Sequence, residues 1–318
     1  MKKILFLLPF ILLSCGSKTA ETISSEDVCP VTFCADSAYE FIVRQCDFGP
    51  RTPTSEAHDK CGDWIIGKFL SYGLNLEEQE AVLKGWDGKD LPCRNIIATY
   101  IPDTTATESL LICAHWDSRP WADADADETN HKTPVLAAND GASGVAVMLE
   151  IARKLSELKP KIKIHFVCFD LEDYGAPDWA DMQTDGSDWA LGSQYFAYKK
   201  PNFADNGILL DMVGGKNARF CYENYSMQFA SSLVAQVWDA AVTAGMSEWF
   251  PQRDGSCIND DHLALNSAGI PTIDIIPYDA QTGFGPTWHT IHDTPENISK
   301  ETLAAVGQTL LQFIYEKQ

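Results

Sequence analysis

The sequence predicts an α/β protein with three layers, in which helices cover both faces of a mixed, mostly parallel central sheet. Two observations lead to this expectation. Several short runs are apolar and rich in β-branched residues, which is typical of strands buried on both faces. Helical patterns, with apolar residues three or four positions apart, lie between these runs. Strands that alternate with helices favour a sheet whose strands run mostly in parallel.

The predicted elements of the first half begin with a helix over 57–72. Two strands follow at 95–101 (NIIATYI) and 109–114 (SLLICA), and both are dominated by aliphatic residues. The next element is a helix over 143–158, because its apolar residues recur at helical spacing. These residues are Val147, Met148, Ile151 and Leu155.

The second half begins with a strand at 163–169 (KIHFVCF), whose apolar run ends abruptly in polar residues. A short apolar strand at 207–210 (GILL) precedes a helical pattern over 226–244. A last strand at 271–276 (PTIDII) leads through a loop to a helix over 300–315. Because neither a repeat nor a second linker interrupts these elements, they are expected to form one large domain.

The N-terminal residues predict an export signal, because two lysines precede an apolar run of about ten residues, too short to span a bilayer. Residues 1–14 are therefore expected to be a signal peptide. The run ends in LLSC, which is similar to a bacterial lipobox and implies cleavage before Cys15 and its lipidation. Residues 15–35 would then be a lipidated tether that holds an exported lipoprotein on the periplasmic side of a membrane. The alternative is an ordinary signal peptide with an incidental cysteine.

Composition restricts the partners and the redox chemistry of the chain. It carries 45 acidic and 24 basic residues, which gives a formal net charge of −21. Nucleic acid is excluded as a partner, because phosphate needs a surface rich in Lys and Arg. Of the 10 cysteines, those after Cys15 are odd in number and lack the CxxC spacing of a metal site. Export permits disulfides, and Cys29 and Cys34 are close enough in sequence to pair.

Polar side chains follow the predicted strands at the points where the strands end. His115 and Asp117 come after the strand at 109–114, and Asp211 comes after 207–210. Other segments contribute four carboxylates and one imidazole. They are Asp140, Asp170, Glu172, Asp173 and His289. Because ligands bind at the carboxyl ends of strands in open α/β sheets, we expect these side chains to surround one site.

Neighbouring carboxylates in such a place indicate a bound cation. Without one, each carboxylate would raise the pKa of the others. Carboxylates and imidazole, with no thiolate nearby, suit a zinc ion that has three protein ligands and one exchangeable position. Asp140, Asp173 and His289 would form such a set. Glu172 would then be free to act as a base beside the metal.

The motifs around these residues resemble those of a known family. In chain order they are HWD (115–117), NDGASG (139–144), LED (171–173), LLD (209–211) and WHT (288–290). Together they are similar to the M28 zinc aminopeptidases and their relatives, the animal-type glutaminyl cyclases. The resemblance implies the zinc aminopeptidase-like fold and a single catalytic domain over 36–318. Asp173 departs from the pattern, since most relatives have glutamate there, so the metal would lie closer to its strand or the backbone would adjust.

The two branches of this family differ in metal content. The aminopeptidases bind two zinc ions, and the second is held by residues that match His115 and Asp211. The cyclases bind one zinc ion, through the three ligands named above. The segment NDDHLALNSAGIPTIDIIPY (259–278) and Trp288 before the metal histidine are similar to the cyclases. We therefore expect a cyclase with one zinc ion.

The resemblance also implies roles for individual residues. Glu172 would take a proton from the substrate amine and deliver it to the departing nitrogen. Asp211 and Asp260 would share a proton and help to hold the leaving amide. The apolar walls of the pocket would come from tryptophans, namely Trp179 and Trp288, with Trp189 as the alternative to Trp179.

The expected activity is conversion of an N-terminal glutamine to pyroglutamate with release of ammonia. Zinc would act as a Lewis acid on the γ-carbonyl, which the α-amine of the same residue attacks. The substrates would be peptides or exported proteins that begin with glutamine. The alternative is an aminopeptidase, with two zinc ions and with Glu172 activating water. A binding protein on an inactive scaffold would need a lost ligand or base, and none is lost.

Other polar residues are interpreted as structural. The acidic run 121–131 (WADADADETNH) is expected to be a solvated loop near the entrance of the site, rather than a calcium site. Asp170 is expected to form hydrogen bonds at the end of its strand, and Asp293 to lie in an ordinary loop. His58 and His262 show no partner pattern.

Overall fold

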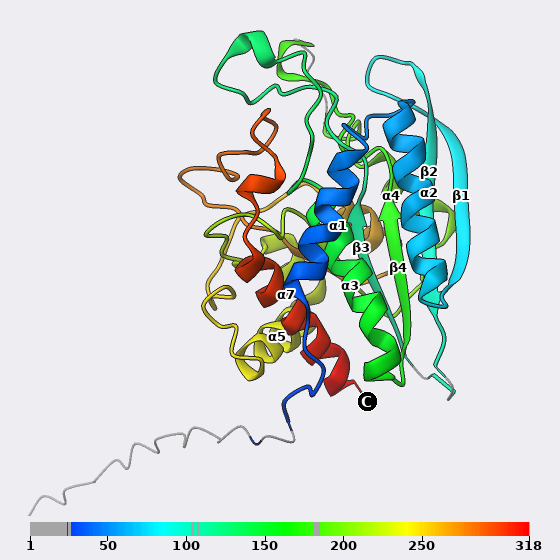
Figure 1. Ribbon diagram of the computed structural model, residues 1–318, viewed down its shortest axis with the longest axis vertical. Coiled ribbons are helices and arrows are strands. Elements are labelled where there is room, and N and C mark those ends of the chain that lie inside the picture. Colours follow the sequence, from blue (N-terminus) through cyan, green and yellow to red (C-terminus); the bar gives the residue numbers. More distant parts are fainter. Residues whose placement is uncertain (1–23, 25–26, 103–104, 107, 181–184, 318) are drawn as a thin grey trace, which may run out of the picture.

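The computed structural model of the protein is shown in Figure 1. It describes residues 24, 27–102, 105–106, 108–180 and 185–317. The predicted signal peptide and Cys15 lie outside the described residues. In the part of the chain that is described, no helix combines the length and the apolar character needed to cross a bilayer.

A six-stranded mixed sheet forms the centre of the fold, with the strand order β1-β2-β4-β3-β5-β6. The strands are β1 (Asn75–Lys84), β2 (Asp90–Tyr100), β3 (Ser109–His115), β4 (Lys163–Phe169), β5 (Asn206–Leu210) and β6 (Thr272–Ile275). Strands β3 to β6 pair in parallel, whereas β2 is antiparallel to both of its neighbours. The predicted mixed, mostly parallel sheet is confirmed, and each predicted strand is present close to its expected position.

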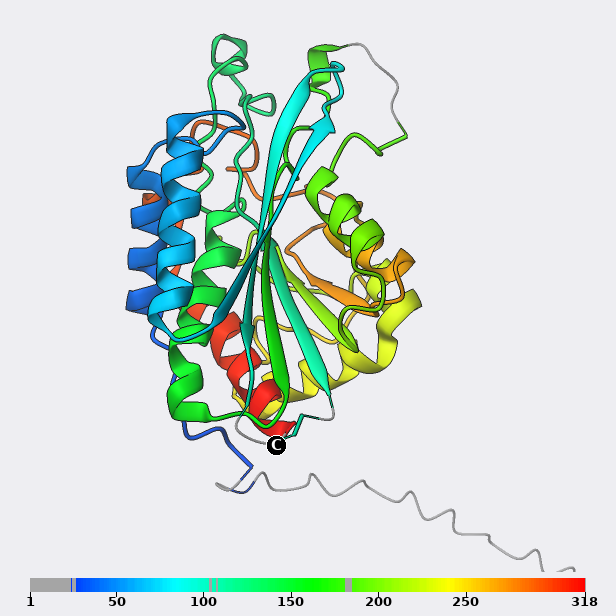
Figure 2. The same ribbon diagram turned by 90° about the vertical axis from the view of Figure 1, so that its right-hand side faces the viewer.

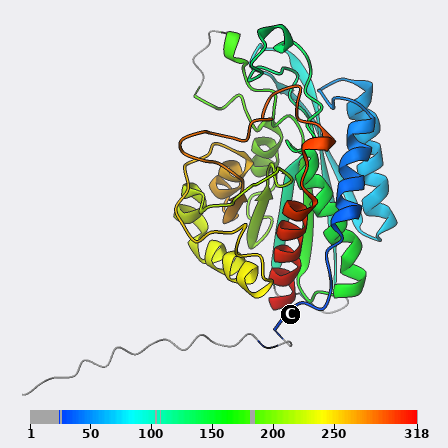
Figure 3. The same ribbon diagram turned by 60° about the vertical axis from the view of Figure 1, so that its left-hand side comes forward.

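Helices cover both faces of the sheet and complete the three predicted layers. They are α1 (Ala35–Asp47), α2 (Glu56–Ser71), α3 (Ala142–Leu158), α4 (Leu191–Lys199), α5 (Asn224–Thr243), α6 (Asp261–Ser267) and α7 (Lys300–Glu316). In Figure 2, α1, α2, α3 and α7 lie on one side of the sheet, and α4 and α6 lie on the other. Helix α5 packs against α7 and β6, as Figure 3 shows in yellow and red.

Alternate residues of the central strands pack into different hydrophobic clusters, one on each face. In β3, Leu110 and Ile112 belong to the large core that includes α3 and α7. Leu111 and Cys113 belong to the smaller cluster on the other face, together with Phe196 of α4. Because both faces are covered, these strands are apolar over most of their length, which is why the sequence predicted them.

The sequence did not predict β1, α1, α4 or α6. Strand β1 lies at the edge of the sheet, and most of its side chains are at least partly exposed. It forms a hairpin with β2, closed at its turn by a hydrogen bond from the Gly85 N–H to the Lys89 carbonyl (3.0 Å). Charged side chains on such an edge hinder pairing with other chains, and they also hide the apolar pattern of a strand.

Residues just ahead of α1 already pack against the core. The N–H groups of Cys29 and Phe33 donate to side chains of α7, Gln312 Oε1 (2.7 Å) and Gln308 Oε1 (2.9 Å) respectively. Packing therefore begins ahead of residue 36, where the catalytic domain was predicted to start. The cysteines from Cys29 to Cys257 are all free thiols, so Cys29 and Cys34 do not form the disulfide that export would permit.

Candidate metal centre and active site

The parallel strands end at one edge of the sheet, where the predicted polar residues lie. The register pairs His115 at the end of β3 with Phe169 at the end of β4. On its other side β3 pairs with β5, with Cys113 opposite Leu209. The turns that follow these strands therefore begin side by side, as expected for a parallel sheet.

The three predicted metal ligands meet at this edge. Ligand atoms of Asp140, Asp173 and His289 all lie within 4.8 Å of one another. His289 Nε2 is 3.1 Å from Asp173 Oδ1 and 3.5 Å from Asp140 Oδ2. Asp140 reaches the site from the turn before α3, in which Gly141 is required, because a Cβ there would lie 2.4 Å from the carbonyl oxygen of His115.

The charge and burial of this set fit a divalent cation. Asp173 is only 1% exposed, and within the described residues neither of its carboxylate oxygens has a hydrogen-bond donor. Burial, together with the nearby Asp173 carboxylate, raises the pKa of Asp140 to about 6. Burial would lower the pKa of His289, but the carboxylates of Asp173 and Asp123 raise it to about 9. Two buried carboxylates and an imidazole therefore face one another, and a donor set of this kind suits zinc.

Two buried carboxylates hold the backbone that carries the ligands. Asp117, which the sequence placed beside His115, accepts hydrogen bonds from the N–H groups of Glu172 (3.1 Å) and Asp173 (3.2 Å). Asp293 accepts hydrogen bonds from the N–H groups of Asn139 (2.8 Å) and Asp140 (3.0 Å). Asp293, interpreted as an ordinary loop residue, thus supports the turn that presents a ligand.

Asp123 is a residue of the site that sequence reasoning missed. It is 7% exposed and pairs with Arg119, and its Oδ1 lies 3.5 Å from His289 Nδ1. A carboxylate on the far nitrogen of a metal-binding histidine fixes the ring and raises its basicity. The run at 121–131 is therefore not a uniformly solvated loop. Its alternating carboxylates concealed this role, because nothing in the local pattern separates a buried Asp123 from an exposed Asp127.

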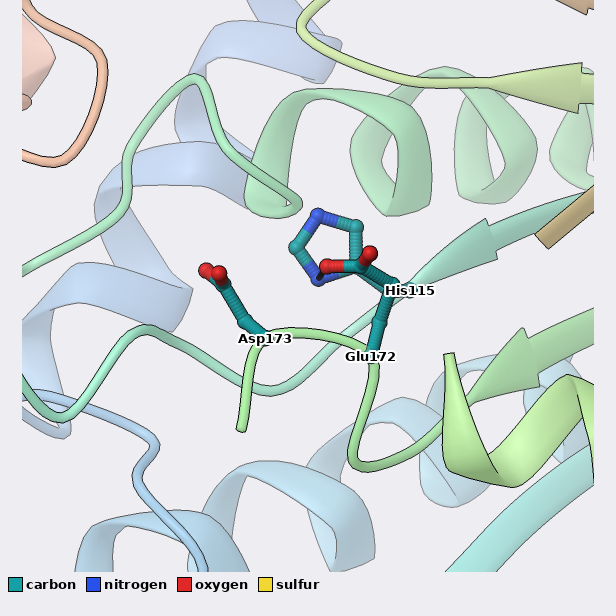
Figure 4. A group of neighbouring side chains, drawn as sticks. All are labelled: His115, Glu172 and Asp173. Atoms are coloured by element: carbon teal, nitrogen blue, oxygen red, sulfur yellow. Dashed lines mark ion pairs between the residues drawn. The ribbon is translucent and has the colours of Figure 1, made fainter. Parts of the chain in front are cut away.

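Glu172 is placed beside the ligands and is accessible to a substrate. Its side chain is 13% exposed, and its Oε2 is 4.0 Å from His115 Nδ1. Figure 4 shows the carboxylates of Glu172 and Asp173 leaving one turn and pointing to the same side as the His115 ring. Burial raises the pKa of Glu172 well above its usual value, against the opposing effect of His115. A carboxylate with a raised pKa is suited to take up a proton and return it.

A second group of possible ligands lies next to the first. Ligand atoms of His115, Asp140 and Asp211 also lie within 4.8 Å of one another. His115 Nε2 is 3.0 Å from Asp140 Oδ1 and 3.3 Å from Asp211 Oδ1. Asp140 can therefore serve either one ion or a pair, and the geometry is compatible with both metal contents.

The site opens into a cavity of about 310 Å³. Its polar lining includes all three predicted ligands and the three predicted catalytic residues, Glu172, Asp211 and Asp260. Burial, followed by the charge of Asp211, raises the pKa of Asp260 well above its usual value. The two predicted acids therefore lie in the same cavity, and the environment of Asp260 favours its protonated form.

Tryptophans form part of the apolar wall of this cavity. Trp288 stacks on the His289 ring at a centroid distance of 3.8 Å, and Trp189 lies parallel to the same ring at 6.0 Å. Both line the cavity. Trp179 is not among its lining residues; it is 41% exposed and packs edge-on against Trp121 at 6.2 Å. Of the two tryptophans considered, Trp189 is the one that lines the pocket.

Comparison with known sequences defines the class of protein. The sequence model of peptidase family M28 matches residues 95–314, which contain every residue of the site. The chain belongs to peptidase family M28. It is an enzyme of this zinc-dependent family, and zinc is the metal that fits its ligand set.

Two solved structures from Bacteroides thetaiotaomicron are each 46% identical and cover 91% of this chain and 99% of their own. One is a glutaminyl cyclase bound to N-acetylhistamine (TM-score 0.87), and the other a leucine aminopeptidase precursor (TM-score 0.85). Aminopeptidase YwaD of Bacillus subtilis is 28% identical over 84% of the chain, and a glutaminyl-peptide cyclotransferase of Gloydius blomhoffii is 27% identical over 70%. The chain spans 54% and 65% of the lengths of these two relatives. Relatives of both kinds thus share this fold and family.

Proposed function

We propose that this chain is a zinc-dependent glutaminyl-peptide cyclotransferase of the animal type. It would convert an N-terminal glutamine to pyroglutamate and release ammonia. The observation that carries the proposal is that Asp211 and Asp260 line the same cavity as Glu172. Burial, followed by the charge of Asp211, raises the pKa of Asp260 well above its usual value, which favours the form that can donate a hydrogen bond to a neutral amide group.

The side chain of an N-terminal glutamine is a neutral amide. The aromatic walls formed by Trp189 and Trp288 suit such an uncharged side chain. The carboxylates that line the same cavity can receive the α-amino group of the substrate, which has a pKa of about 8 in water.

The residues of the chain would then divide the reaction between them. Asp140, Asp173 and His289 would hold a zinc ion, which would supply Lewis-acid chemistry at the γ-carbonyl of the substrate. Glu172 accepts a proton from the attacking α-amine and donates it to the departing amide nitrogen. The cavity keeps the glutamine side chain folded, so that the attack is intramolecular.

The relatives support the cyclase and its animal type. Glutaminyl cyclases are among the solved structures at 46% identity. The segment 259–278 and Trp288 match the animal-type pattern, and an animal cyclotransferase is 27% identical. The aminopeptidase remains the second candidate, because His115, Asp140 and Asp211 are grouped closely enough to hold another ion.

The experiment that tests the proposal uses two peptides that differ only in their first residue, glutamine or leucine. The zinc-loaded protein should remove one ammonia, about 17 mass units, from the glutamine peptide and leave the leucine peptide intact. Mass spectrometry and an ammonia assay report both reactions. Release of free leucine without cyclisation would replace this function with the aminopeptidase.

We also propose that the protein is a periplasmic lipoprotein that modifies exported proteins beginning with glutamine. The lipobox-like LLSC and the lysine-led apolar run are the support for this location. A Cys15→Ala variant expressed with its native leader should move from the membrane fraction to the soluble fraction. An unchanged distribution would rule out an anchor at Cys15.

A further inference from the structure

A second cavity lies next to the candidate active site. Its volume is about 480 Å³, which is larger than that of the first cavity and within the range of specific ligand sites. The two cavities share four lining residues, Met212, Tyr278, Phe284 and Trp288. The two cavities are therefore adjacent and share part of their lining.

The charge of the second cavity is opposite to that of the chain. Over the whole sequence, acidic residues outnumber basic ones by 45 to 24. The lining of the second cavity has three basic residues, Lys216, Arg219 and Arg253, and a single acidic one, Asp279. An excess of positive charge in a strongly acidic protein is unexpected for a surface without a function.

Two of these cations have no carboxylate partner. Arg219 pairs with Glu248 at 2.6 Å. Lys216 Nζ donates instead to the backbone carbonyl of Glu296 (2.7 Å), and Arg253 Nε to the Cys221 thiol (3.1 Å). Within the described residues, no carboxylate oxygen lies within 4.0 Å of the charged groups of Lys216 or Arg253.

Asn139 adds an unpartnered amide to the same cavity. Its side chain is only 8% exposed, and its Oδ1 accepts a hydrogen bond from the Gly214 N–H (2.8 Å). In the described structure its Nδ2 group donates to no other group. Asn139 lines the second cavity, and it directly precedes the metal ligand Asp140. Its free donor and the two unpaired cations all favour a ligand that accepts hydrogen bonds and carries negative charge.

We propose that the second cavity binds the peptide residues that follow the first residue of the substrate, and that it prefers acidic side chains among them. The proposal rests on the proposed function in one respect: the first residue of a peptide occupies the cavity that contains Glu172. The rest of that peptide must leave this cavity, and the shared wall formed by Tyr278, Phe284 and Trp288 leads to the basic cavity.

Binding to an inactive variant tests this preference without relying on turnover. Five-residue peptides would begin with glutamine and carry one glutamate or one lysine at position two, three, four or five. Their affinity for the zinc-loaded Glu172→Gln protein would be measured by fluorescence anisotropy with a dye at the C-terminus. At one or more positions the glutamate peptide should bind about tenfold more tightly than its lysine counterpart, and the ratio should fall as salt rises.

A matched pair of double variants separates the effect of charge inside the second cavity from the effect of the net charge of the protein. Lys216→Met with Arg253→Gln removes the two unpaired cations, and it should bring the ratio to within about twofold. Lys60→Met with Arg44→Gln makes the same change in net charge on α2 and α1, which contribute no residue to either cavity. This control should keep the full preference, and thermal unfolding would verify that both variants fold.

The outcomes separate this proposal from the proposed function. Equal affinity of glutamate and lysine peptides at all positions, or a preference that survives loss of Lys216 and Arg253, overturns the acidic subsite. Turnover of glutamine amide and leucine amide by the wild-type protein tests the reaction separately, because these substrates have no second residue that could enter the second cavity. If neither substrate is cyclised in this turnover test, the proposed cyclase activity is wrong, whereas the measured preference for acidic peptides is unaffected.

Discussion

Asp170 provides the sharpest test of how the fold positions the site. It follows β4 directly, is fully buried, and accepts three hydrogen bonds. The donors are the His58 ring Nε2 (2.8 Å), the Arg94 N–H (2.7 Å) and the Leu171 N–H (2.9 Å). Leu171 has a φ of +57°, an unfavourable conformation for a branched residue, and it leads straight into Glu172. Asp170 therefore holds the turn that presents the proposed base.

The substitution Asp170→Ala leaves all three donors without an acceptor. Each orphaned donor that is buried costs about 1–3 kcal/mol. Water that enters the space left by the carboxylate would satisfy some of these donors. We therefore take about 1 kcal/mol for each donor and expect the free energy of unfolding to fall by about 3 kcal/mol. Breaking a buried charged pair typically costs about 3–5 kcal/mol, which agrees. His58→Ala should cost less, because Asp170 keeps its two backbone donors.

The assay is urea unfolding of the metal-free protein, followed by tryptophan fluorescence, for both single variants and the double variant. Because His58 and Asp170 are in contact, their effects should be non-additive by about 1–3 kcal/mol. Asp59→Ala is the matched control: its carboxylate lies 3.8 Å from His58 Nδ1 but is 77% exposed, so the expected loss is below about 1 kcal/mol. A loss for Asp170→Ala no larger than for this control, or strictly additive effects, would refute the reasoning.

Three further substitutions test the site itself. Glu172→Gln should keep zinc bound and lower turnover at least about 100-fold, because the proton carrier is lost; turnover close to wild type would remove Glu172 from this role. Asp173→Ala and His289→Ala should each lose zinc, and elemental analysis of the purified variants would show a retained ion if the ligand set is wrong. Trp189→Ala should raise KM for glutamine peptides more than Trp179→Ala does, since only Trp189 lines the cavity, and the reverse order in steady-state kinetics would restore Trp179 to the pocket.

The candidate ligands could be predicted because both the residue types and their positions along the chain indicate a metal site. Asp140 and Asp173 lie close to the ends of elements that the apolar pattern defines, and a parallel sheet brings those ends together. His289 lies in the long segment between β6 and α7, so its approach to within 4.8 Å of the other two followed from the motif and not from the sheet alone. The strands themselves were predictable because burial on both faces leaves a continuous apolar run.

The residues that support the site were not predictable in this way. Asp123 contacts the His289 ring, and Asp293 accepts a hydrogen bond from the backbone N–H of Asp140. In both cases the partner lies far away in the sequence. The choice between Trp179 and Trp189 depended on the path of a polar loop that has no periodicity. The same limit applies to the pair of His58 and Asp170, separated by 112 positions. Long-range contacts between loops leave no local signature, so propensity and spacing cannot detect them.

The concentration of buried carboxylates has a consequence for stability. Asp140 lies beside Asp173 and Asp211, and their repulsion in the metal-free protein is only partly offset by His115 and His289. A ligand that binds the native state alone stabilises it, so zinc should raise the melting temperature of the wild-type protein.

The substitution Asp140→Asn should make the thermal stability of the protein independent of zinc binding. It removes one of the repelling charges and keeps a side-chain oxygen near His115, so the metal-free variant should be at least as stable as metal-free wild type. It should also lose the increase in melting temperature with zinc, because a neutral amide is a much weaker ligand. Thermal unfolding with a chelator and with added zinc measures both effects. A metal-free variant clearly less stable than metal-free wild type would mean that the Asp140 carboxylate serves the fold as well as the ion, through its contact with His115.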